Sequence, residues 1–343
     1  MKKFIAPIAL LLVIAGCGST STSAVTATPS ATGSAVSQST PSALPVYPTL
    51  WPRSANLAYD STHHNVVLFG GIHSHSDTPN DTWIWQGHRW TQQQPAANPV
   101  GRQGAVLVDD PEMHAVVLFG GVTFTGTFLN DTWAWTGLNW VQLFPAHAPS
   151  VRYGAAAAFD PVRHVVLLFG GTSCICAGGM DDTWEWNGLD WSQAHPSSSP
   201  SGRGFARLAV NVAHGEAVLF GGFEGLQDTW TWDGVTWTQA HPNNTPPAIG
   251  EANPMAAQLV YDSVRKVVLF AGPNQSTRKT DTLTWSGDDW TVVTAATAPE
   301  ERDGAGLAFD VVEGITVFAG GYSFGGEVST TWGWDGATWS MLG

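Results

Sequence analysis

The stretch NDTWAWTGLNW, residues 130–140, places three tryptophans within eleven positions. Trp133 and Trp135 are two residues apart, so in a β-strand their indoles lie on the same face. The Thr136-Gly137 pair that follows occupies the position of a tight hairpin turn, and Trp140 then begins a second strand. The stretch therefore predicts a β-hairpin whose indoles either bind a sugar or fill a protein core.

These tryptophan positions recur through the chain. Seventeen of the eighteen tryptophans occupy the same three positions of a repeat, and the fifth copy has Leu283 in the first of them. The copies are Trp83/Trp85/Trp90, Trp133/Trp135/Trp140, Trp184/Trp186/Trp191, Trp230/Trp232/Trp237, Leu283/Trp285/Trp290 and Trp332/Trp334/Trp339. A ligand platform has no need to recur so evenly, whereas a packing unit does. We therefore expect these indoles in the core.

A second feature of the repeat is an apolar run that ends in Phe-Gly-Gly or a variant of it. The last glycines are 49 to 51 residues apart, at Gly71, Gly121, Gly171, Gly222, Gly272 and Gly321. In the third copy, residues 152–160 predict a first strand and residues 164–171 a second strand that is buried on both faces. Residues 182–186 predict a third strand, and Trp191 begins a fourth. Four short strands in every fifty residues are typical of β-propeller blades.

The order R-x-G, apolar run, F-G-G, N-D-T-W, W, P resembles the kelch repeat over residues 51–343. The resemblance implies an all-β fold, a six-bladed β-propeller of four-stranded blades. It carries almost no information about function, because one fold serves many activities. Trp51 lies outside the pattern and is a candidate to cover the join between the first and last blades.

The N-terminal residues predict export. Residues 1–16 have two lysines, a short apolar run and small residues before Cys17, as in a secretory signal peptide. Residues 14–17, IAGC, resemble a bacterial lipobox, which implies cleavage before Cys17 and its lipidation; an ordinary signal peptide is the alternative. Residues 17–50 are rich in Ser, Thr, Ala and Pro and predict a disordered tether. We expect an extracytoplasmic protein, lipid-anchored to the bacterial cell membrane or outer membrane.

The charge balance excludes one class of partner. The chain has 28 acidic and 14 basic residues, so it repels phosphate backbones and nucleic acid is not an expected partner. We expect a monomer, and we expect no cofactor.

Strand parity indicates where a ligand would bind. The loops after Phe-Gly-Gly and the loops between blades share one face of the predicted ring, and the former vary most, as binding loops do. Their candidate ligand residues are His73, His75, Asp77, Phe124, Phe128, Glu224, Tyr322, Phe324 and Glu327. The two histidines and Asp77 are too few for a convincing metal site, so no metal is predicted. Phe124 and Phe128 are either stacking groups or a lid on their own blade.

Arginines form the second candidate feature. Arg53, Arg102, Arg152, Arg203 and Arg302 each begin a predicted first strand, and the fifth repeat has Glu251 in that region. One interpretation is a positive collar around the axis that binds a carboxylate or an acidic peptide. The other is structural, with each arginine tying loops together.

Cys174 and Cys176 are the cysteines that remain once Cys17 is lipidated, and they are a candidate disulfide in an oxidising compartment. The sequence has no serine-nucleophile elbow, phosphate loop or HExxH motif. Galactose oxidase, a kelch enzyme, needs a copper site for which this chain has no matching residues.

The favoured function is a non-catalytic scaffold that binds a protein or a glycan. The alternatives are a carbohydrate-active or N-acetylneuraminate-epimerase-like enzyme that uses the arginine collar, and a purely structural envelope protein. An enzyme requires a deep axial pocket with a paired acid and base, whereas a binder requires a broad face.

Overall fold

A computed structural model of the protein describes residues 56–72, 77–174, 178–247, 257–274, 276–323 and 326–343, without the side chains of Glu224 and Glu327. The predicted signal peptide, the lipidation of Cys17, the tether and the role of Trp51 concern residues outside these ranges, and they stay predictions.

The described residues form six four-stranded antiparallel sheets, in each of which the strands pair in chain order. Blade 1 contains β1 (Asn56–Asp60), β2 (Asn65–Phe69), β3 (Thr82–Gln86) and β4 (Arg89–Gln93). Blade 2 contains β5 (Val106–Asp110), β6 (Ala115–Phe119), β7 (Thr132–Trp135) and β8 (Trp140–Leu143). Blade 3 contains β9 (Ala156–Asp160), β10 (Val165–Phe169), β11 (Thr183–Trp186) and β12 (Trp191–Ala194).

Blade 4 contains β13 (Arg207–Asn211), β14 (Glu216–Phe220), β15 (Thr229–Trp232) and β16 (Trp237–Ala240). Blade 5 contains β17 (Gln258–Asp262), β18 (Val267–Asn274), β19 (Lys279–Trp285) and β20 (Trp290–Val293). Blade 6 contains β21 (Gly306–Asp310), β22 (Ile315–Ala319), β25 (Thr331–Trp334) and β26 (Trp339–Met341). Loops carry a 3₁₀ turn, η1 (Phe223–Gly225), and a small hairpin of β23 (Tyr322–Ser323) and β24 (Gly326–Glu327).

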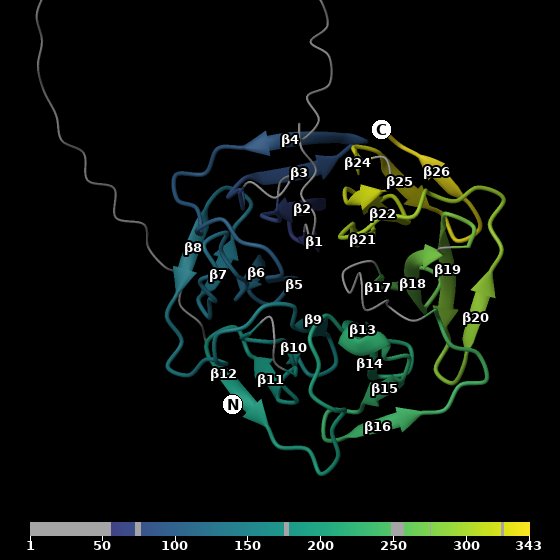
Figure 1. Ribbon diagram of the computed structural model, residues 1–343. Helices are drawn as coiled ribbons and strands as arrows, with labels where there is room; N and C mark the ends of the chain where they lie inside the picture. Colours follow the sequence, from purple (N-terminus) through teal and green to yellow (C-terminus); the bar gives the residue numbers. More distant parts are fainter. Residues whose placement is uncertain (1–55, 73–76, 175–177, 248–256, 275, 324–325) are drawn as a thin grey trace, which may run out of the picture. The chain divides into compact units, whose positions relative to one another are not determined.

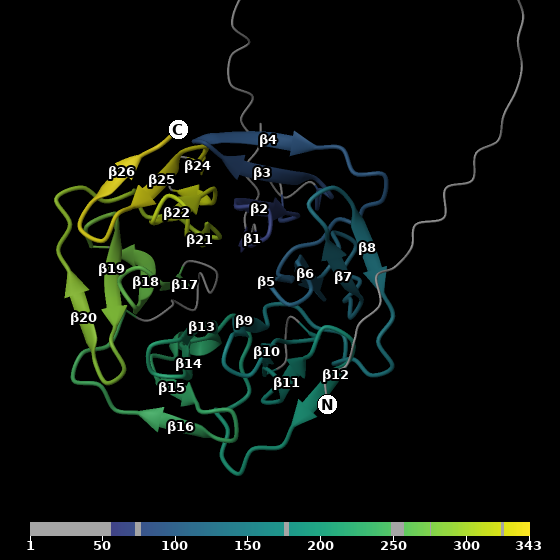
Figure 2. The same cartoon turned by 180° about the vertical axis from the view of Figure 1, so that it is seen from behind.

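The six sheets stand in a ring around a central axis, with the first strand of each blade innermost and the fourth on the rim (Figures 1 and 2). The six-bladed β-propeller is therefore confirmed. The predicted first strand of blade 3 begins at Ala156 and not at Arg152. The reason is that residues before it belong to a loop, in which Tyr153 pairs with Thr172 after the Phe-Gly-Gly turn.

The cores lie between neighbouring blades. The second strands are almost wholly buried, as a strand covered on both faces must be. The third tryptophan of a repeat packs on the phenylalanine that ends the preceding blade's second strand; the ring centroids of Phe69 and Trp140 are 4.9 Å apart. The indoles at the second and third positions are almost fully buried in the six blades. The prediction of core residues is confirmed for these two positions, where each tryptophan contributes about 3 kcal/mol or more of stability. At the first position Trp83 is buried, whereas Trp133, Trp184, Trp230 and Trp332 are half-buried.

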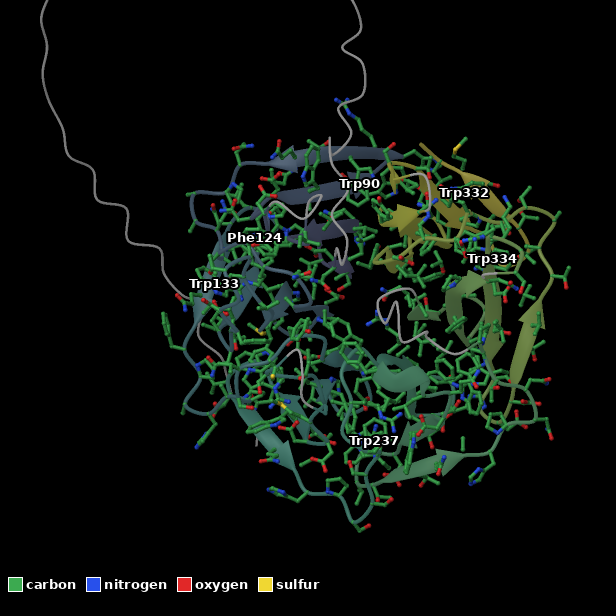
Figure 3. The ribbon with its side chains drawn as sticks, viewed as in Figure 1. Trp90, Phe124, Trp133, Trp237, Trp332 and Trp334 are labelled. Atoms are coloured by element: carbon green, nitrogen blue, oxygen red, sulfur yellow. The ribbon has the colours of Figure 1, made fainter. Side chains whose placement is uncertain are left out.

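One hydrogen bond repeats at every junction between blades. The third tryptophan donates its indole N–H to a threonine in the third strand of the preceding blade, over 2.8 to 3.1 Å. This threonine begins the strand in every blade except blade 5, where Thr282 lies within β19. The same bond joins Trp90 of blade 1 to Thr331 of blade 6, at 3.1 Å, and so closes the ring. Figure 3 shows Trp90 beside the blade that carries Trp332 and Trp334. Closure therefore uses side chains, and within the described residues the two blades exchange no strand.

Hairpin glycines mark a second contact between blades. Gly234 adopts φ of +97°, which favours glycine, and a Cβ there would overlap the Arg163 side chain of the preceding blade. At four other junctions a side chain of the preceding blade also lies over the hairpin glycine. The pairs are His63 over Gly137, Met113 over Gly188, His214 over Gly287 and Arg265 over Gly336. The matching hairpin glycine of blade 1, Gly87, has nothing within 4 Å of its Cβ position among the described residues. The closing junction therefore lacks one contact that the other five have.

Candidate functional site

The ring has two faces with different chemistry. The loop face carries the loops after Phe-Gly-Gly and the loops between blades; they are hydrogen-bonded to each other, as in Gly71 N–H to Arg102 C=O at 2.8 Å. The turn face carries the turns between first and second strands and the hairpins between third and fourth strands. Sequence reasoning placed the ligand on the loop face.

The arginines preceding the first strands do not form an exposed collar. Arg102, Arg152, Arg203 and Arg302 are at most 2 % exposed. Arg152 donates to the carboxylate of Asp182 through two nitrogens, at 2.7 and 2.8 Å, and to the Gly170 carbonyl at 2.9 Å. Arg102 and Arg203 repeat this pattern, and Arg302 pairs with Glu300 at 2.7 Å. Of the two interpretations, the positive collar is wrong for these four residues and the structural one holds, because each arginine is buried and paired within its own blade.

The partner carboxylates show the strength of these pairs. Burial alone would raise the pKa of Asp131, Asp182 and Asp228, but hydrogen bonds and charge from the arginines outweigh burial and lower it. Each pair joins the loop before a first strand to the loop before a third strand, so these arginines tie loops together. Arg53 and Glu251 lie outside the described residues.

The other loop-face candidates are scattered. Asp77 is exposed, and Phe124 is 52 % exposed on the loop of blade 2, where Figure 3 shows it. Phe128 is half-buried and begins an edge-to-face row that continues through Tyr153, Phe205 and Phe223, with centroids 4.8 to 5.4 Å apart. Phe128 therefore packs as a lid, whereas Phe124 does not.

The remaining candidate residues of the loop face provide little evidence for a ligand site. Tyr322 is half-buried, and its backbone pairs with that of Asp303. Glu224 lies in η1 and Glu327 in β24. Cys174 is exposed, but its predicted disulfide partner Cys176 lies outside the described residues, as do His73, His75 and Phe324. Among the described residues no three His, Cys, Asp or Glu side chains are grouped so as to hold a metal ion.

The innermost strands line an axial channel. A cavity of about 140 Å³ opens among the first residues of these strands and contains Asn56, Arg207 and Gln258. Arg207 is half-buried, its Nε donates to the Ala257 carbonyl, and burial lowers its pKa to about 10. Sequence reasoning missed Arg207. The available signal was a charged residue at a position that holds Val106 or Ala156 in other blades.

At the turn face the channel widens into a cavity of about 480 Å³, here called the turn-face mouth. Its wall comes from the fourth residue of each innermost strand: Tyr59, Asp109, Phe159, Val210, Tyr261 and Phe309. The two tyrosines contact the turn of the preceding blade: the hydroxyl of Tyr59 hydrogen-bonds the backbone of Val312, and that of Tyr261 the backbone of Ala213.

Exposed aliphatic side chains lie beside the turn-face mouth on the turns of blades 3 to 6. They form an arc, here called the turn-face apolar ring, which consists of Val162, Val212, Val264, Val311 and Val312, each 40 to 63 % exposed. Farther out, the hairpins expose Leu138, Leu189 and Val235 by 72 to 80 %. Sequence reasoning missed this ring because it favoured variable loops. The signal was a valine in turns that are otherwise polar, such as DPVRH at 160–164.

Asp109 departs from the pattern of the wall. Its carboxylate accepts a hydrogen bond from the Ser61 N–H at 3.2 Å. Its pKa is raised to about 7: burial is the largest cause, the bonds from Ser61 oppose it, and the nearby Asp60 and Asp110 add to it. Asp60 and Asp110 differ in role, since each accepts hydrogen bonds from backbone N–H groups of its own turn.

Comparison with known proteins adds no relative: neither a protein-family model nor a curated protein matches the sequence of this chain. Within the part of the chain that the structure describes, no helix has both the length and the apolar character needed to span a membrane.

Proposed function

We propose that this propeller is a non-catalytic binding scaffold of the kelch type that is held outside the cytoplasm by a lipid on Cys17. Its binding surface is the turn face, and its partner is a protein. The proposal rests on the turn-face apolar ring.

The turn-face apolar ring supports a protein partner. Single exposed apolar residues are common, but five exposed valines on four successive turns beside an aromatic-lined cavity are the pattern of an interaction site. A glycan presents hydroxyl groups that require hydrogen-bond partners, and the aliphatic ring supplies none. A protein side chain can enter the turn-face mouth while the ring packs on the surface around it.

The described arginines do not support the enzyme alternative. It required arginines that face a substrate, and the four described ones are buried in ion pairs. Among the described residues that line the turn-face mouth, Asp109 is the one carboxylate, and no histidine, lysine or arginine stands beside it as a partner acid or base.

The test compares two triple variants of the full chain in an envelope extract. One carries Val162→Asp, Val264→Asp and Val312→Asp on the turn face. The control carries Val100→Asp, Phe124→Asp and Val151→Asp, which adds the same charge at exposed apolar positions outside the turn face.

We expect a protein that co-purifies with the wild type to be retained by the control and lost by the turn-face variant. Circular dichroism checks that both variants are folded. Retention by the turn-face variant, or loss by the control alone, would contradict the proposal.

A further inference from the structure

The wall of the turn-face mouth contains one charged side chain. Four of the six innermost strands place an aromatic ring at the fourth position: Tyr59, Phe159, Tyr261 and Phe309. Blade 4 places Val210 there, and blade 2 places Asp109. The other lining residues are apolar or neutral, so Asp109 stands as a carboxylate at the edge of an aromatic cavity.

No cation balances this carboxylate within the described residues. The partners of Asp109 are the backbone N–H and the hydroxyl of Ser61, which are neutral. None of the ion pairs among the described side chains includes Asp109, although Asp60 in the adjoining turn pairs with His63 at 2.8 Å. A half-buried carboxylate without a counter-ion is unfavourable, and a ligand with a positive charge would relieve that.

Aromatic walls add to the preference for a cation. The faces of Tyr and Phe rings are electron-rich and attract ammonium groups, more strongly where water is excluded. The whole chain carries a formal charge of −14, which raises the local concentration of cations and lowers that of anions. The carboxylate, the rings and the net charge therefore favour the same ligand class.

We propose that the turn-face mouth binds an ammonium group carried on an apolar arm, with Asp109 as its counter-ion. The arm packs among the aromatic rings, and the ammonium group lies at the blade 1 and blade 2 side, where Asp109 is held by Ser61. On a protein partner this group is a lysine side chain or an N-terminal amine. The inference rests on the proposed binding role of the turn face and specifies its ligand.

The experiment uses two probes of nearly equal shape, benzylamine and benzyl alcohol, of which only the first is a cation. Isothermal titration calorimetry at pH 8 measures their dissociation constants for the full chain, for Asp109→Asn and for Glu313→Gln. The asparagine keeps the size and the acceptor for Ser61 and removes the charge. Glu313 is an exposed carboxylate in a turn of the same face that does not line the mouth, so its variant controls for net charge.

We expect benzylamine to bind the wild type and Glu313→Gln at least tenfold more tightly than benzyl alcohol. In Asp109→Asn the two probes should bind about equally, with benzyl alcohol unchanged. Equal binding of the probes to the wild type, the same preference in Asp109→Asn, or binding of neither probe would overturn the inference.

The failure of this inference is distinguishable from the failure of the proposed function. If benzyl alcohol binds as tightly as benzylamine, the turn-face mouth is a site for apolar ligands and the preference for a cation is refuted. If the turn-face triple variant retains the co-purifying protein, the proposed function is refuted, regardless of how benzylamine and benzyl alcohol bind.

Discussion

Replacing Arg152 with alanine tests whether the arginines serve the fold or a ligand. The Arg152 side chain is 1 % exposed and donates two hydrogen bonds to Asp182, two to Ser150 and one to the Gly170 carbonyl. Its removal leaves Asp182, which is 20 % exposed, with the Trp184 indole as its remaining side-chain partner. Breaking a buried ion pair on one side costs about 3 to 5 kcal/mol, and the partial exposure of Asp182 favours the lower end.

The assay is urea unfolding at pH 7, followed by tryptophan fluorescence. We expect Arg152→Ala to lower the free energy of unfolding by about 3 kcal/mol. Arg152→Lys should lower it by less, because the ammonium keeps a positive charge beside Asp182; some loss remains, since an ammonium cannot form both bonds to the carboxylate. Arg89, which is exposed on a hairpin, is the control, and Arg89→Ala should change the value by less than about 0.5 kcal/mol. A stable Arg152→Ala, within about 1 kcal/mol of the wild type, would refute the structural role.

Three further substitutions test the hairpin glycines, the junction between blades 1 and 6, and Asp109 separately. Gly234→Ala should destabilise by about 1 to 3 kcal/mol, because Gly234 has positive φ and is covered by the preceding blade, and chemical denaturation should show a smaller loss for Gly87→Ala at the uncovered position. Thr331→Val should remove the hydroxyl that accepts the hydrogen bond from the Trp90 indole N–H, costing about 1 to 3 kcal/mol, and hydrogen exchange should show faster opening of blades 1 and 6 and no change elsewhere. Asp109→Asn should become more stable relative to the wild type as pH rises from 5 to 8, by about 2 to 3 kcal/mol, because the raised pKa of Asp109 makes the folded state favour its protonated form, an advantage lost with rising pH. A stability advantage of Asp109→Asn that shrinks as pH rises would contradict the argument from the pKa of Asp109. Hydrogen exchange that rises uniformly in Thr331→Val would contradict the argument for ring closure.

The repeat made the fold predictable from sequence. Strand alternation and the fifty-residue period constrain every blade together, so one worn copy, such as Leu283 in place of tryptophan, does not hide the pattern. Ring closure was not predictable, because the Trp90 to Thr331 bond joins residues 241 positions apart. Both residues nevertheless occupy repeat positions that form the same bond at every other junction.

The site was less predictable, since it depends on departures from the repeat. Arg152 and Asp182 both recur in the sequence, but only their pairing at 2.7 Å shows that the charge is used internally. Asp109 lies next to Asp110, and the sequence alone does not distinguish the residue that lines the mouth from the one that accepts hydrogen bonds from its own turn. Register resolves this, because adjacent residues of a strand point to opposite faces.

The central claim is that the partner binds the turn face and not the loop face. A photoreactive benzoylphenylalanine placed at Val264 on the turn face, or at Phe124 on the loop face, tests it in the cells that make the protein; both positions are more than half exposed. The account predicts a discrete cross-linked product from position 264 that Val162→Asp and Val312→Asp abolish, with no such product from position 124. A discrete product from position 124 alone would contradict the account and return the binding site to the variable loops.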